Sequence, residues 1–247
     1  MKRQTPNQPP RTSRRAACRA AVVLCLVAAM ARPAQMKAQD DAVYRMEVGV
    51  AGGVGFMLDD TNAKYYGSTS FAGGALVRFL LNPRMAVKAN LLYGKTGGNT
   101  TGVNDFYPAN PSAAGSERLN YSYNGALYDL SALFEINFLP YGIGADYLGY
   151  KRLTPYLQVG VGATYGTAGK AFTANIPLGV GLKFKLARRW NLGLDWTVHF
   201  TLSDKLDGLE APHAIPTSGF RGKDHYSFTT LTLTYDISPK CPDCNRD

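Results

Sequence analysis

The residues of this chain that could do chemistry are few, and His199 is the first of them. It is the one histidine on a predicted strand, with Asp195 on the same face four residues earlier and Thr197 and Thr201 around it. A histidine beside a carboxylate can act as a general base. Because no serine or cysteine nucleophile is placed beside it, a hydrogen-bond network explains these residues better than catalysis does, and we expect no enzyme activity.

The second candidate is the CxxC motif formed by Cys241 and Cys244. Such a motif alone is compatible with a redox site, half a metal site or a disulfide. A thioredoxin-like motif caps a helix after a strand, whereas this one follows the last predicted strand. The favoured interpretation is a structural or intermolecular disulfide, and whether the cysteines pair with each other or with a partner stays open. No metal or cofactor is expected.

The glycine-rich segments do not predict a nucleotide site. The glycines of residues 52–55 and 160–162 lie inside predicted strands, whereas dinucleotide and P-loop motifs place them between a strand and a helix. We expect these glycines to relieve crowding in a narrow interior, and we expect no small-molecule substrate.

The N-terminal region predicts export. Six basic residues precede an apolar run at residues 20–31, and no acid occurs before Asp40. This is the composition of a signal peptide, and the run is too short to remain as a membrane-spanning helix. We expect residues 1–31 to be removed, with cleavage as late as residue 39 as the alternative. The early cut leaves 21 of the 27 bases against 18 acids, so the net charge of +9 does not indicate a nucleic-acid partner.

Beyond the leader, apolar and polar residues alternate with a period of two, which is the pattern of amphipathic strands. In residues 127–138, for example, Asp129, Ser131 and Glu135 fall on the face opposite the apolar residues. No stretch approaches 18 apolar residues, which excludes an α-helical membrane protein. The predicted strands are residues 43–58, 70–81, 85–95, 127–138, 155–165, 175–186, 191–202 and 226–237.

Charged side chains lie on the face of the predicted strands opposite the apolar residues, as in membrane barrels with a polar lumen. Since isolated buried charges are costly, a balanced set predicts ion pairs across a narrow interior, which eight strands can enclose and fill. The sequence therefore predicts an all-β fold: residues 40–238 form an eight-stranded antiparallel up-and-down transmembrane β-barrel with a filled lumen. The residues assigned to the lumen are Arg45, Arg78, Lys88, Lys183 and Lys185 as bases and Glu47, Asp129, Glu135, Asp195 and Asp236 as acids.

The connecting segments alternate between short and long, as in outer-membrane barrels with short periplasmic turns and long outer loops. Residues 82–84 and 187–189 are short, and residues 139–154 are a long exception on the same side. This predicts a protein of the cell outer membrane with both termini, including the tail 239–247, in the periplasm. The longer polar connectors are residues 59–69, 96–126, 166–174 and 203–225, and the aromatic residues expected at the two lipid interfaces are Tyr44, Phe56, Phe71, Tyr93, Tyr165, Trp190 and Tyr235.

Four segments carry a resemblance to a known family: residues 154–156 (TPY), 175–186 (NIPLGVGLKFKL), 191–209 (NLGLDWTVHFTLSDKLDGL) and 239–247 (PKCPDCNRD). In them the chain resembles the PorG-type outer-membrane proteins of the type IX secretion system of Bacteroidetes-type bacteria. The resemblance covers nearly all of the expected mature chain, although the first three strands would fit many small barrels.

The resemblance implies a non-enzymatic protein that helps to place a periplasmic ring of the lipoprotein PorK and its partner PorN at the outer membrane. The parts able to touch such a ring are the periplasmic turns, residues 139–151 and the tail with Cys241 and Cys244. A filled eight-stranded barrel is too narrow for folded cargo, so a role in secretion would be accessory to a larger translocon. The competing hypothesis is a surface adhesin or general structural barrel acting through its outer loops, especially residues 96–126.

Overall fold

The computed structural model describes residues 44–58, 62, 65–100, 108–110, 113, 115–143, 149–203, 205–208 and 223–239. The predicted signal peptide and the two cysteines of the tail lie outside these residues and stay predictions. In the described part of the chain, no helix is long and apolar enough to cross a membrane. The strands are β1 (Tyr44–Leu58), β2 (Ser70–Asn82), β3 (Met85–Asn99), β4 (Ser122–Asn137), β5 (Leu153–Gly166), β6 (Ala171–Lys185), β7 (Trp190–Thr201) and β8 (His225–Pro239).

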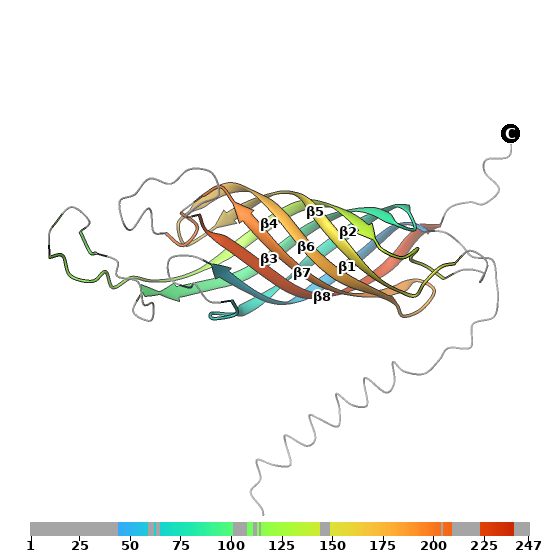
Figure 1. The fold of residues 1–247 in the computed structure, drawn as a ribbon, viewed down its shortest axis with the longest axis horizontal. Helices are drawn as coiled ribbons and strands as arrows, with labels where there is room; N and C mark the ends of the chain where they lie inside the picture. The colour runs from blue at the N-terminus through green and yellow to red at the C-terminus, as the bar shows by residue number, and fades with distance from the viewer. Residues whose placement is uncertain are drawn as a thin grey trace, which may run out of the picture. The chain divides into compact units, whose positions relative to one another are not determined.

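The eight strands form one closed barrel in sequence order, which confirms the predicted fold class. Each strand pairs antiparallel with the next, and β1 pairs with β8 from Tyr44↔Pro239 to Leu58↔His225 to complete the ring. The strands are strongly tilted to the barrel axis (Figure 1). Closure pairs the backbone of every strand on both sides, which a barrel in lipid requires.

The two ends of the barrel differ, and we name them for their connections. The turn end carries the start of β1, the end of β8 and the connections 83–84, 138–152 and 186–189. The loop end carries the other four connections. Two of these differ from the prediction: the β5–β6 connection is a tight turn at 167–170, and β3 and β4 extend the ladder into the predicted loop 96–126 as far as Asn99↔Ser122.

The extended β3–β4 hairpin projects beyond the neighbouring strands at the loop end (Figure 1). The ladder continues past the strands, since the Thr100 amide donates to the Tyr121 carbonyl at 2.9 Å. Alternation of apolar and polar residues did not mark this part because a ribbon outside the membrane has no lipid-facing side to keep apolar.

Apolar side chains cover the outside of the barrel. Leu130, Val161, Leu178 and Leu231 are each at least half exposed, whereas the alternate residues of the same strands face the lumen. An apolar exterior around a polar, charged interior is the arrangement of a transmembrane barrel of the outer-membrane type. Water would otherwise surround this surface at a large free-energy cost.

The aromatic residues expected at the lipid interfaces divide into two groups. Phe71 and Trp190 are 62% and 45% exposed on the outer surface. Tyr44 and Phe56 lie on the same face of β1 as the exposed Val50 and Val54, but neighbouring side chains cover them, which corrects the prediction of direct lipid contact at these two positions. The Phe56 ring lies 4.6 Å from that of Tyr66 in the β1–β2 loop. The Tyr44 ring is covered by the guanidinium of Arg189 in the β6–β7 turn.

Glycines make room for large side chains in the narrow lumen. A Cβ at Gly181 would lie 2.4 Å from the ring of Tyr156, and one at Gly55 or Gly94 would lie 2.7 Å from the ring of Phe228. These rings can therefore fill the interior only because the neighbouring strands carry no side chain there, Gly181 and Gly55 being the direct cross-strand partners of Tyr156 and Phe228. An apolar layer near the loop end consists of Met57, Ala72, Leu92, Leu127, Leu206, Tyr226 and Phe228.

Candidate functional site

The lumen holds a buried ionic cluster centred on the Glu135 carboxylate of β4. Its oxygens lie 2.7 Å from Arg78 Nε, 3.1 Å from Lys88 Nζ and 2.5 Å from Lys183 Nζ. Arg78 also pairs with Glu47 of β1. Since side chains from five strands meet here, the cluster ties opposite walls of the barrel together.

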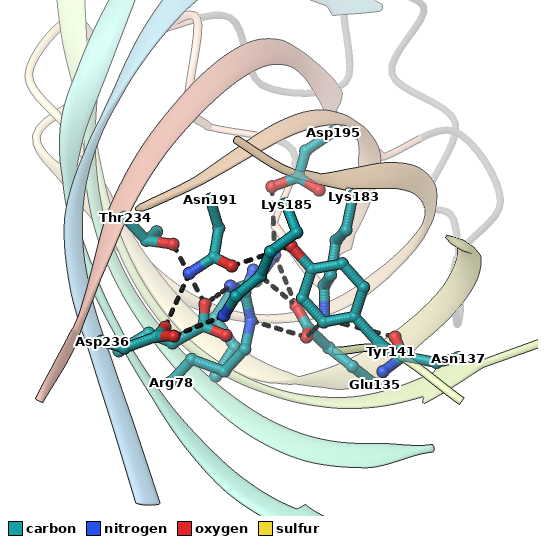
Figure 2. Close-up of polar contacts among 12 residues, drawn as sticks. Arg78, Glu135, Asn137, Tyr141, Lys183, Lys185, Asn191, Asp195, Thr234 and Asp236 are labelled. Atoms are coloured by element: carbon teal, nitrogen blue, oxygen red, sulfur yellow. Dashed lines mark hydrogen bonds and ion pairs between the residues drawn. The ribbon is translucent and has the colours of Figure 1, made fainter. Parts of the chain in front are cut away.

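Two further ion pairs extend this cluster along the lumen. Lys88 Nζ lies 3.2 Å from Asp195 of β7 and donates to Gln158 at 2.6 Å. Lys185 pairs with Asp236 of β8 on the turn-end side. Figure 2 shows the side chains of Arg78, Glu135, Lys183, Lys185, Asp195 and Asp236 converging in the interior of the barrel. The ionic cluster thus contains four bases and four acids, namely Arg78, Lys88, Lys183, Lys185, Glu47, Glu135, Asp195 and Asp236.

Two residues assigned to the lumen do not join the ionic cluster. Arg45 is exposed, because it lies at the start of β1, on the rim of the turn end. Asp129 is buried nearer the loop end, in a separate network. The ionic cluster is balanced without either residue, so the predicted pairing of five bases with five acids is wrong in its membership.

Asp129 is the centre of this second network. Its carboxylate accepts hydrogen bonds from Ser131 at 2.9 Å, Asn175 at 2.8 Å and Tyr226 at 2.6 Å. His199 Nδ1 lies 3.4 Å away, and the imidazole stacks on Tyr226 with 4.5 Å between ring centroids. We call this group the Asp129 network.

His199 is therefore partnered by Asp129. The sequence pattern had suggested Asp195 instead. Four residues along a strand span about 13 Å, too far for a hydrogen bond between His199 and Asp195. Asp195 pairs with Lys88 instead. His199 is 1% exposed. A substrate in solution has no access to such a group, which supports the interpretation as a structural network.

Both ends of the lumen are closed by side chains. At the turn end, Tyr141 from the β4–β5 connection is 9% exposed and donates to Asn191 at 2.8 Å. Burial, followed by the charge of Glu47, raises the pKa of Tyr141 far above its ordinary value, so it remains a neutral phenol. At the loop end, Leu206 is 1% exposed within the apolar layer.

The lumen between these closures has little free space. A void of about 10 Å³ lies beside Lys88, Asn90 and Asp195, which is roughly the size of one water molecule. Tyr156 and Lys183 fill the neighbouring volume, with the ammonium 4.4 Å from the ring centroid. The barrel is thus filled, and its lumen does not form a conduit for solutes.

A filled lumen predicts an electrically silent barrel. The full mature protein in planar lipid bilayers is expected to show no stable ion-conducting state, because the ionic cluster and the two closures leave no continuous water path. Single-channel recording measures this directly, and a wide outer-membrane porin in the same bilayers serves as the positive control. Reproducible open channels would contradict the filled lumen.

Sequence patterns missed several members of the lumen. Gln158 and Asn191 occupy lumen-facing positions of β5 and β7, so the same alternation that identified the charges could have found them. Tyr141 carried no such signal, because it lies in a connection outside any strand. The position of Tyr141 in the lumen follows from the tertiary structure, in which the connection folds back over the turn end. There the Tyr141 amide donates to the Pro83 carbonyl at 2.9 Å.

The sequence pattern of a family described as a domain of unknown function, DUF6089, matches residues 20–246. No curated protein matches the sequence.

Three solved structures are similar to the barrel at low identity. The N-terminal β-barrel domain of OprF from Pseudomonas aeruginosa is 12% identical, with a TM-score of 0.40, covering 79% of this chain and 100% of that one. Ail, the attachment invasion locus protein of Yersinia pestis, solved with the heparin analogue sucrose octasulfate, is 10% identical, with a TM-score of 0.42 and coverages of 80% and 100%. Neisserial surface protein A is 9% identical, with a TM-score of 0.41 and coverages of 78% and 97%. Each likeness is too distant to bear on function.

Proposed function

Because this chain belongs to the DUF6089 family of domains of unknown function, whose description assigns no activity, we propose a function from its sequence and geometry. The protein is a non-enzymatic outer-membrane component of the type IX secretion system. It anchors or positions the periplasmic ring of PorK and PorN beneath the membrane, with the turn end and both termini on the periplasmic side.

The observation that carries this proposal is the filled lumen. A barrel with a buried ionic cluster, and with Tyr141 and Leu206 at its ends, can act only through its outer surfaces. The sequence resemblance to PorG-type proteins indicates PorK and PorN as the partners. The position of the β4–β5 connection supports the turn end as the part of the barrel that contacts them. The two described ends of that connection are joined to each other, since the Gly142 amide donates to the Lys151 carbonyl at 3.1 Å and the Lys151 amide donates to the Pro140 carbonyl at 2.7 Å. The Tyr141 amide, which donates to the Pro83 carbonyl at 2.9 Å, holds this part against the β2–β3 turn, so it can present a defined surface.

Deleting the gene in a bacterium that carries it is expected to abolish export of type IX cargo and to release PorK and PorN from a co-purified outer-membrane complex. Export is measured as secreted cargo activity, and complementation with the wild-type gene is the control. A complementing Cys241→Ser, Cys244→Ser variant tests whether the tail bonds to a partner, since a higher-mass adduct on non-reducing gels would then vanish. Normal export and an intact ring in the deletion strain would overturn the proposal.

A second candidate function is adhesion through the loop end. The observation that favours it is the β3–β4 hairpin, whose ladder runs to Asn99↔Ser122 beyond the adjoining strands. Such a projecting ribbon is a suitable contact surface. Loss of attachment with unaffected export, in the same deletion strain, would support this alternative over the first.

A further inference from the structure

We propose that the outer surface of the turn end binds the phosphate group of a membrane phospholipid, through Arg189, which lies beside the rings of Tyr44 and Tyr235, and through the adjacent exposed Arg188. The site lies on the lipid-facing side, where β8 ends and β1 and β7 begin. It goes beyond the proposed function, which concerns a protein partner in the periplasm.

The guanidinium of Arg189 is held in a fixed position between two tyrosine rings. Its carbon lies 5.3 Å from the centroid of Tyr44 and 5.9 Å from that of Tyr235. Nε donates to the Tyr44 hydroxyl at 2.9 Å and Nη1 donates to the Tyr235 hydroxyl at 3.1 Å. These bonds account for two of the five N–H donors of a guanidinium, and a fixed guanidinium is well suited to bind two phosphate oxygens at once.

Neighbouring side chains place this guanidinium at the level of the lipid headgroups. Trp190 is 45% exposed on the outer surface and packs edge-on against Tyr235, with 5.0 Å between centroids. Leu233, farther along β8 on the same outer face, is exposed toward the acyl chains. Trp and Tyr prefer the boundary between hydrocarbon and headgroups, so an arginine among them lies where lipid phosphates are found.

The β6–β7 connection is too short to carry the two arginines away from this boundary. It comprises residues 186–189, and the Leu186 amide bonds back to the Trp190 carbonyl at 2.9 Å. The Asp236 amide likewise donates to the Arg189 carbonyl at 2.8 Å. A protein partner in the periplasm would have to enter the headgroup layer to reach Arg189, which favours the lipid as the ligand.

The charges at the turn end also favour an anion. Of the acids that the structure describes there, Glu47 and Asp236 are buried in ion pairs. Glu117, the only exposed acid among the described residues, lies on the loop end. Several bases on one rim attract anionic headgroups. The exposed bases of the turn end are Arg45, Arg84, Lys151, Arg152, Arg188 and Arg189.

Native mass spectrometry of the full mature protein, folded in detergent, can test the site with two lipids that share their acyl chains. Phosphatidylglycerol carries the phosphate, and diacylglycerol lacks it. We expect the wild type to retain phosphatidylglycerol about tenfold better, and the Arg188→Gln, Arg189→Gln double variant to lose this preference. The Lys95→Gln, Lys170→Gln double variant removes two exposed charges at the loop end and should behave as the wild type does.

Further measurements distinguish a lipid phosphate from a free phosphate ion as the ligand and check that each variant is folded. Arg189→Lys keeps the charge but loses the planar donor pair, so an intermediate preference is expected, and heat-modified migration on gels reports that each variant is folded. Displacement of phosphatidylglycerol by millimolar inorganic phosphate would identify a site for the free ion and overturn the lipid assignment. Equal retention by the wild type and the arginine double variant would also overturn it. Because no secretion partner is present, this result is independent of the proposed function.

Discussion

Replacing Glu135 by glutamine is expected to lower the free energy of unfolding of the barrel by about 3–5 kcal/mol, the usual cost of removing one partner from a buried ion pair. The carboxylate faces three cations, with Arg78, Lys88 and Lys183 all within 3.1 Å. Glutamine has nearly the same shape, so packing is retained and the effect isolates the charge. After the change, the four bases of the ionic cluster would face only three acids.

This loss can be measured by urea unfolding in lipid vesicles, followed by tryptophan fluorescence. Trp190 and Trp196 are the two tryptophans of the chain, and both face outward on β7, so their emission reports contact with lipid. Glu117→Gln, which removes an exposed acid, is the matched control and should change stability little.

A second substitution tests whether charge balance is the cause. The Glu135→Gln, Lys183→Gln double variant restores equal numbers of bases and acids, and it is expected to recover part of the lost stability through a favourable coupling energy. If Glu135→Gln unfolds at the same urea concentration as Glu117→Gln, the ionic cluster does not stabilise the barrel.

Replacing Asp129 by alanine is expected to cost about 3 kcal/mol, since each buried donor left without an acceptor costs about 1–3 kcal/mol. The change removes the acceptor for Ser131, Asn175 and Tyr226 together. Tyr226→Phe is the matched control, because it keeps the ring and the Asp129 carboxylate and removes only the hydroxyl, with its bonds to Asp129, Thr164 and Asn175. About 1 kcal/mol is expected from it, because the Asn175 amide still has Asp129 and Thr164 as acceptors.

The same unfolding experiment compares the two variants, and their order is the decisive result. A loss for Asp129→Ala no larger than that for Tyr226→Phe would mean that the Asp129 network has no common centre. A loss several times larger would mean that one carboxylate organises the lumen near the loop end, just as Glu135 does in the ionic cluster nearer the turn end.

These two networks explain why the working surfaces of the protein lie outside the lumen. Each network joins side chains of non-adjacent strands, and opening a pore would separate them with a loss of several kcal/mol. The two regions left for function are the hairpin at the loop end and the basic, aromatic rim at the turn end. The two proposals use different parts of the turn end: the protein ring would contact the β4–β5 connection, whereas the lipid phosphate would contact Arg189 beside Tyr44 and Tyr235.

Much of this architecture could be predicted from the sequence alone. A period of two in residues such as 127–138 assigns each side chain to one of two faces, and the chemistry of the faces distinguishes a membrane barrel from a soluble one. The charges on the second face, Glu135 and Lys183 among them, were therefore assigned to the lumen. The tail with Cys241 and Cys244 also remains a prediction from the sequence.

Only the tertiary structure decided which of these residues meet. Alternation defines a face but neither the depth of a residue along the tilted strand nor the strand opposite it, so it could not separate Asp129 from the ionic cluster or exclude Arg45 at the rim. Tyr141 and Arg189 lie in connections, where no period exists, and their contacts arise because closure of the barrel brings β1, β7 and β8 together at one rim. The sequence by itself determined the barrel and its polar interior, whereas strand closure and register decided the contacts that fill it.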